Sequence, residues 1–148
     1  MAYPNALSAY RETRIRTASQ GQLIILLYDE AVKQLDRGLE LLNAKPSGRI
    51  KPAHYEQINH AVVKAQEIIT ELMVSLDFEQ GGEISKNLFS LYTWFNRELL
   101  EANIARDMER IRAVRVMLDD LRGAWNEIVA KTSAEAVRRP SDGVNIAG

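Results

Sequence analysis

The stretch from Ser19 to Asn43 constrains the fold of this chain more than any other. Its apolar residues recur every three or four positions, and at about 100° per residue they gather in one broad arc of a helix. The arc consists of Ile24, Leu27, Tyr28, Ala31, Val32, Leu35, Leu39 and Leu42. Ser19 followed by Gln22 is typical of a helix start, and the segment 45–48, Lys-Pro-Ser-Gly, is a stop signal. Because the arc is wider than a two-helix seam requires, this helix must contact at least two neighbours, which indicates a bundle.

Three more amphipathic helices are predicted from about Ala53 to Leu76, from about Glu83 to Asn103, and from an Asp107 cap to about Lys131 or Val137. Gln80-Gly81-Gly82 should end the second helical region. Residues expected in the buried stripes include Tyr55, Ile84, Met117 and Ile128. Long helices with short connections favour an all-α, antiparallel up-down four-helix bundle. We expect a flap segment over residues 1–18, the bundle over 19–131, and a helix extension with a flexible tail over 132–148.

Several apolar residues fall outside these stripes. Val63 and Val74 lie eleven residues apart on the second helix, and Phe89 and Leu100 lie eleven apart on the third. Eleven residues make about three helical turns, so the members of each pair point the same way. Collinear exposed apolar residues indicate grooves for another helix or an extended apolar chain. The alternative is that they bury against the N-terminal segment, the tail or a second copy of the chain.

Three leucines of the first helix, Leu23, Leu26 and Leu41, lie on or beside its polar side and add apolar surface. The preceding segment carries Leu7, Tyr10 and Ile15 among polar residues. Two interpretations of that segment remain open, a partly ordered terminus or a flap that lies against the body.

Composition excludes several classes of function. A formal net charge of −1 argues against nucleic-acid binding, and the absence of cysteine excludes thiolate metal sites. No signal peptide and no apolar run of about 20 residues is visible, so we expect a cytoplasmic protein that does not insert into a membrane. No paired Glu-x-x-His, HExxH, P-loop or GxSxG motif occurs, and we expect no enzymatic activity, no cofactor and no metal.

His60 supports an alternative class. It points away from the main stripe of the second helix, as the histidine of a phosphotransfer domain does, and such domains are also four-helix bundles. Those domains usually carry Lys three positions later and then Gly, whereas this chain has Val63 and Lys64.

A set of short motifs occurs in a fixed order across about residues 5–128. They include Asn5-Ala-Leu-Ser-Ala-Tyr10, Leu27-Tyr28-Asp29, Leu76-Asp77-Phe78-Glu79, Gly81-Gly82-Glu83-Ile84, Asn87-Leu88, Leu91-Tyr92 and Leu121-Arg122-Gly123-Ala124-Trp125. In this ordered set the chain resembles the FliS family of flagellar export chaperones, which bind flagellin.

The resemblance implies a chaperone that holds the disordered C-terminal region of flagellin, prevents its polymerisation in the cytoplasm and presents it to the flagellar export gate. The residues we assign to cargo binding are Leu23, Leu26, Val63, Val74, Phe89 and Leu100. In the family the N-terminal segment with its tyrosine can occupy a groove when cargo is absent, a role that falls here to Leu7, Tyr10 and Ile15. Direct contact of Tyr10 with cargo or the gate is the alternative. A homodimer of the cargo-free protein is a further expectation.

Overall fold

The computed structural model describes residues 20–44 and 48–138, with side chains described up to residue 132. Four helices occupy this part of the chain and no strand occurs in it: α2 (Gln20–Asn43), α3 (Pro52–Val74), α4 (Phe78–Ala105) and α5 (Met108–Arg138). The predicted cap residue Ser19 and the segment with Leu7, Tyr10 and Ile15 lie outside the described residues.

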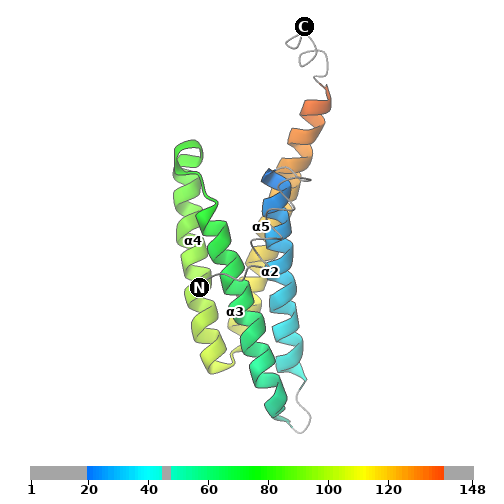
Figure 1. The fold of residues 1–148 in the computed structure, drawn as a ribbon, viewed down its shortest axis with the longest axis vertical. Helices are drawn as coiled ribbons and strands as arrows, with labels where there is room; N and C mark the ends of the chain where they lie inside the picture. The colour runs from blue at the N-terminus through cyan, green and yellow to red at the C-terminus, as the bar shows by residue number, and fades with distance from the viewer. Residues whose placement is uncertain (1–19, 45–47, 139–148) are drawn as a thin grey trace.

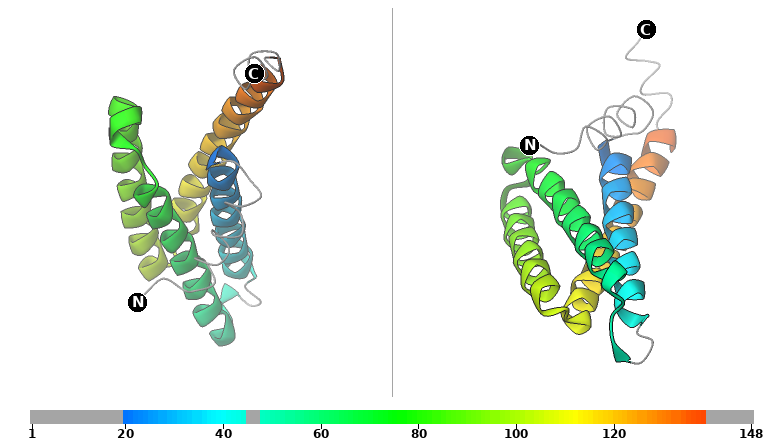
Figure 2. Two further views of the ribbon diagram at one scale, coloured as in Figure 1. Left: turned by 45° about the horizontal axis from the view of Figure 1, so that its top comes forward. Right: turned by 60° about the horizontal axis from the view of Figure 1, so that its bottom comes forward.

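The four helices form the predicted antiparallel up-down bundle. α2 packs against α3 and α5, α4 packs against the same two helices, and the chain reverses direction from each helix to the next (Figures 1 and 2). The helix axes do not stay aligned along their whole length. The α3–α4 pair diverges from the α2–α5 pair at the upper end in Figure 1. The bundle therefore has an open end and a closed end.

The core is built from the stripes that helical periodicity predicted. Its largest fully buried side chains include Tyr28, Phe95, Leu35, Ile69 and Ile111. Tyr28 and Tyr92 are both buried, and their hydroxyls hydrogen-bond to each other between α2 and α4. Burial raises the pKa of both phenols, since the charged form loses its hydration.

The start of α4 differs from the prediction. Gly81 and Gly82 do not end a helix; α4 begins earlier, at Phe78, because an Asp77 carboxylate oxygen accepts the backbone N–H groups of Glu79 and Gln80 at 3.1 and 3.0 Å. Gly82 kinks the helix instead, with φ at 50° and ψ at −121°, a conformation that suits glycine.

Four side chains expected in the core are exposed: Tyr55, Ile84, Met117 and Ile128. Ile84 is 70% exposed because it lies at the open end, where α4 leans away from α5. By periodicity Met117 and Ile128 lie on the same side of α5 as Arg110, which pairs with α4, so they too face the side where the helices separate. A helical wheel assumes parallel helices and cannot foresee this divergence.

Ion pairs connect α2 to α5. Arg115 donates to both carboxylate oxygens of Asp36 at 2.8 and 3.2 Å, and Arg122 donates to Asp29 at 2.8 Å. Asp119 lies between the two arginines, 2.8 Å from Arg122 and 3.7 Å from Arg115. This α2–α5 ladder fixes the two helices in register over about two helical turns.

The closed end is joined by a polar network. Arg106 ends α4 in the left-handed conformation, with φ at 55°, and its guanidinium donates to the Asn103 carbonyl at 2.8 Å. The same guanidinium lies 5.2 Å from the ring centroid of Tyr55, which accounts for the position of that ring outside the core. Asn103 donates to Asn59 at 2.8 Å, so the start of α3 and the end of α4 are held together.

Candidate docking surfaces

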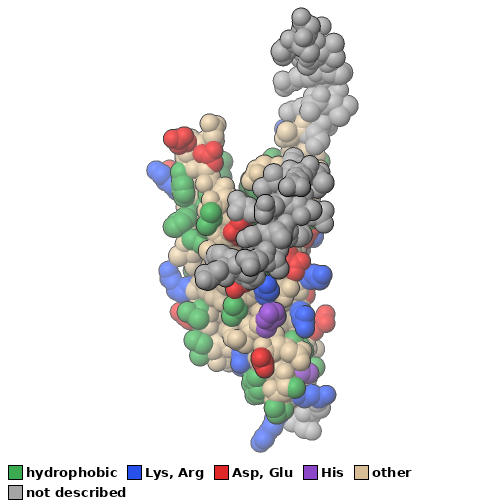
Figure 3. Space-filling model, viewed as in Figure 1, with side chains coloured by type: hydrophobic (Ala, Val, Ile, Leu, Met, Phe, Trp, Pro, Cys, Tyr) green, Lys and Arg blue, Asp and Glu red, His purple; other side chains and the backbone are tan. Residues whose placement is uncertain are grey.

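The first candidate surface is the outer side of the α3–α4 pair, which we call the α3–α4 face and define by Val63, Val74, Phe89 and Leu100. These side chains are 38%, 66%, 43% and 53% exposed, as periodicity predicted. Figure 3 shows hydrophobic side chains gathered on this side of the molecule. Burial of all four inside the monomer would have removed this surface, and the structure excludes that outcome.

Hydrogen bonds set the register of the α3–α4 face. Gln66 donates to the Asn96 carbonyl at 3.0 Å, and the Asn96 amide donates to the Thr70 hydroxyl at 3.1 Å. Because the helices are antiparallel, these bonds place Val63 near the level of Leu100 and Val74 near the level of Phe89. The face thus has two apolar patches, about 16 Å apart at 1.5 Å per residue, with a polar rung between them.

Two exposed residues extend the face beyond what we predicted. Phe78 contacts Phe89 edge-on, with ring centroids 6.0 Å apart, and enlarges the upper patch. Ile104 is exposed at the lower end of α4, one turn beyond Leu100. Both residues could have been found from the sequence. Ile104 lies one helical turn after Leu100, and Phe78 follows Asp77, a good helix-capping residue.

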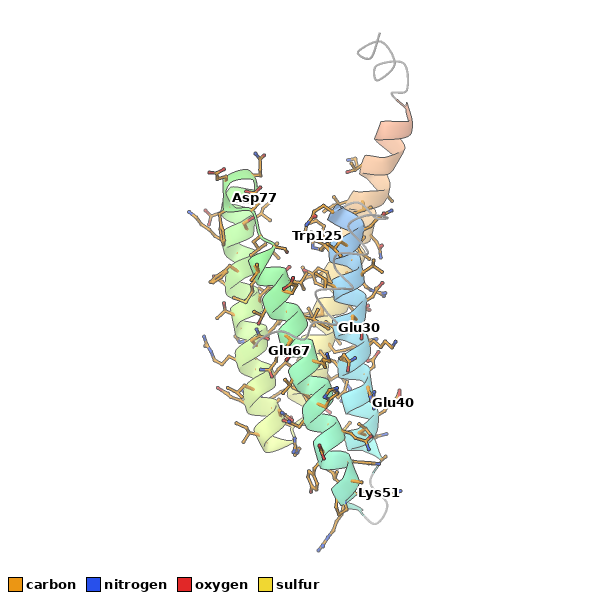
Figure 4. All side chains as sticks on the ribbon, in the orientation of Figure 1. Glu30, Glu40, Lys51, Glu67, Asp77 and Trp125 are labelled. Atoms are coloured by element: carbon orange, nitrogen blue, oxygen red, sulfur yellow. The ribbon has the colours of Figure 1, made fainter. Side chains whose placement is uncertain are left out.

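The second candidate surface is a cavity of about 320 Å³ at the open end. Its lining is largely apolar and comes from all four helices, with Ile24, Leu72, Ile84, Tyr92 and Trp125 among the contributors. Figure 4 shows Asp77 and Trp125 on opposite sides of this opening. Sequence reasoning missed the cavity, because it exists only where the two helix pairs separate.

Not every residue assigned to cargo binding lies on these surfaces. Leu23 is 1% exposed, so its assignment to an exposed surface is wrong: it lies one turn before the buried Leu27. Leu26 and Leu41 are half-buried. Val63, Val74, Phe89 and Leu100 are the assigned residues that the structure brings to one face.

His60 is exposed on α3, as any surface histidine would be. Within the described ranges no three His, Cys, Asp or Glu side chains are grouped as a metal site, and no helix there is long and apolar enough to cross a membrane.

Comparison with known proteins identifies the family to which this chain belongs. The family model described as flagellar protein FliS matches residues 3–132. A flagellar secretion chaperone FliS from Salmonella typhimurium is 35% identical over 128 residues, which cover 86% of this chain and 89% of the relative. A protein of the same name from Bacillus subtilis is 29% identical over 129 residues, covering 87% and 90%. In Pseudomonas aeruginosa, flagellar secretion chaperone FliSB is 31% identical over 117 residues, covering 79% and 86%. This chain belongs to the FliS family of flagellar proteins.

Proposed function

We propose that this protein is a cytoplasmic chaperone that binds the disordered C-terminal segment of flagellin on the α3–α4 face. Binding would keep the segment from polymerising with other flagellins before export. The observation that carries this proposal is the alignment of exposed Val63, Val74, Phe89 and Leu100 in two patches on adjacent helices. An amphipathic helix that spans three turns would cover both patches.

The energetics suit a client that must be released. Fully burying an exposed apolar side chain is worth about 1.5–3 kcal/mol, and these four, which are 38–66% exposed, gain roughly half of that on docking. Ordering a disordered segment costs about 2–5 kcal/mol, and association costs about 4–15 kcal/mol more. The apolar patches therefore offset these costs only in part, and further contacts, such as the cavity at the open end, must contribute to a stable complex.

The N-terminal segment is proposed to regulate access. Gln20 is the first described residue of α2 and lines the cavity, so the preceding chain starts at the rim of the cavity. Tyr10 lies ten residues before Gln20, and a fully extended chain of that length spans about 33 Å. In this proposal Leu7, Tyr10 and Ile15 cover apolar surface until the client displaces them. Presentation of the loaded complex to the flagellar export gate, and a homodimer of the cargo-free protein, belong to the same proposal.

The test is Phe89→Asp. A charge in the upper patch should abolish binding of a flagellin C-terminal peptide, measured by titration calorimetry, because an unpaired carboxylate there would be desolvated. The helical circular dichroism and the Tm should stay near those of the unmodified protein, since Phe89 is already 43% exposed.

Val116→Asp is the matched control. Val116 is also an exposed apolar residue, but it lies on the outer side of α5, away from the α3–α4 face. The Val116→Asp variant should bind the flagellin peptide as tightly as the unmodified protein does. Equal loss of binding in both variants, or unfolding of Phe89→Asp in parallel with its loss of binding, would contradict the proposed site.

A further inference from the structure

Charged residues border the α3–α4 face on both sides, with opposite signs. Glu56 and Glu67 lie on the α3 side, and Lys86 and Arg97 lie on the α4 side. Each pair has the same eleven-residue spacing as the apolar pairs. At about 100° per residue, the acidic pair points on average roughly 20° farther round α3 than Val63 and Val74 do. The basic pair points roughly 60° farther round α4 than Phe89 and Leu100 do. The lower patch thus lies between the acidic rim and Arg97, and Lys86 borders the upper patch.

The two rims meet at the same level in the middle of the face. Gln66 donates to the Asn96 carbonyl, so the next residues along the chain, Glu67 and Arg97, lie level on opposite sides of the polar rung. Figure 4 shows Glu67 on the outer side of α3. Glu101 of α4 pairs with Arg110 at 2.6 Å and points about 40° farther round the helix than Arg97, away from the apolar patches.

Because α-helices are right-handed, the two rims can distinguish between the two directions in which a bound helix could run along the face. In a right-handed helix that runs parallel to α3 with its apolar side on the face, the residue after each apolar anchor turns toward α4 and the residue before it turns toward α3. A helix that runs the other way presents the same residues to the opposite rims. The order of charges around the anchors therefore determines which direction pairs each charge with its opposite.

We propose that the α3–α4 face orients its occupant: it takes an amphipathic helix whose two sides carry opposite charge, basic against α3 and acidic against α4. This proposal rests on the proposed function, since it specifies the helix that the same face would bind. A client with Lys or Arg before its anchors and Asp or Glu after them would run parallel to α3. The reversed order would run antiparallel.

Designed peptides test direction separately from flagellin binding. Two helical peptides of identical composition carry apolar anchors eleven residues apart, one with Lys before and Glu after each anchor and one with the reverse. Each bears a fluorophore at its N-terminus. Because the chain has no cysteine, Ala53→Cys and Glu79→Cys each provide a single site for a quencher, at the closed and the open end of the bundle.

We expect the Lys-anchor-Glu peptide to be quenched from position 53 and the Glu-anchor-Lys peptide from position 79. Exchanging the rims, with Glu56→Lys, Glu67→Lys, Lys86→Glu and Arg97→Glu together, keeps the net charge and should invert both results. A third peptide with Lys on both sides should bind about three- to tenfold more weakly at low salt, a difference that shrinks at high salt because these pairs are exposed.

Quenching from the same position for both peptides, or from both positions for each, would overturn the proposal and leave the proposed function intact. If no peptide binds while the flagellin segment binds in a Phe89-dependent way, this proposal is likewise overturned and the proposed function remains intact. If neither the peptides nor the flagellin segment binds, both proposals fail.

Discussion

At the scale of single residues, two glycines lie in opposite surroundings. A Cβ on Gly81 would lie 1.9 Å from the Ser85 hydroxyl oxygen and 3.0 Å from its Cβ, while a Cβ on Gly123 would meet nothing within 4 Å. The Ser85 hydroxyl cannot simply turn aside without loss, since it donates to the Asp77 carbonyl at 2.9 Å. Gly81 thus lets the chain close the capped turn that begins α4.

We expect Gly81→Ala to lower the free energy of unfolding by about 1–3 kcal/mol through overpacking, and Gly123→Ala to raise it by about 0.5–1 kcal/mol through helix propensity. Urea denaturation measures both. In a Ser85→Ala background most of the Gly81→Ala penalty should disappear, because the two changes share one contact. A stabilising Gly81→Ala would show that the turn at the start of α4 adjusts freely.

Exposure of individual residues was predictable where the helices stay together. Helical periodicity correctly assigned Val63, Val74, Phe89 and Leu100 to the surface, because α3 and α4 pack against each other along that side. It failed for Leu23 and for Ile84. The exposure of Ile84 depends on how the helices are inclined at the open end, which periodicity within one helix does not encode.

At the scale of elements, the end of α2 at Asn43 was predicted correctly, because an amphipathic arc and a Pro-Gly stop agree. The start of α4 was misplaced because two consecutive glycines look like a terminator. The Asp77 cap outweighs them locally, and Gly82 produces a kink in place of an end.

The α2–α5 ladder gives a test at this scale. Replacing Arg115 and Arg122 by Ala should cost about 1–2 kcal/mol of unfolding free energy, because two partly exposed interhelical pairs are lost at up to about 1 kcal/mol each. The matched control is Arg112→Ala, whose partner Glu109 lies on the same helix, and it should cost less than about 0.5 kcal/mol.

Unfolding in urea at low and high salt measures the difference, urea being chosen because it is uncharged. The cost of the double substitution should fall as salt is added, since these pairs are screened. An equal cost for the double substitution and for Arg112→Ala would mean that the ladder does not hold α5 to α2.

At the scale of the whole molecule, the two ends of the bundle differ in how they are held. The closed end has the Asn59–Asn103 hydrogen bond and the Arg106 network, and Arg110 of α5 donates to Glu98 of α4 at 3.0 Å. The open end has the cavity and the kink at Gly82. Local opening is easier where fewer apolar side chains are packed. The cavity, the first described residues of α2 and the upper apolar patch all lie at this weaker end.

Deleting residues 1–16 tests whether that end is gated. If Leu7, Tyr10 and Ile15 compete with the client for apolar surface, the shortened protein should bind a flagellin C-terminal peptide more tightly, because the competing state is removed. Amide hydrogen exchange over 78–88 should become faster in the free shortened protein and slow again when the peptide binds, while exchange over 92–102 changes little. Weaker binding after the deletion would instead mean that Tyr10 contacts the client directly. Unchanged affinity together with unchanged exchange would rule out both roles, since a segment that neither covers the open end nor touches the client has no part in loading.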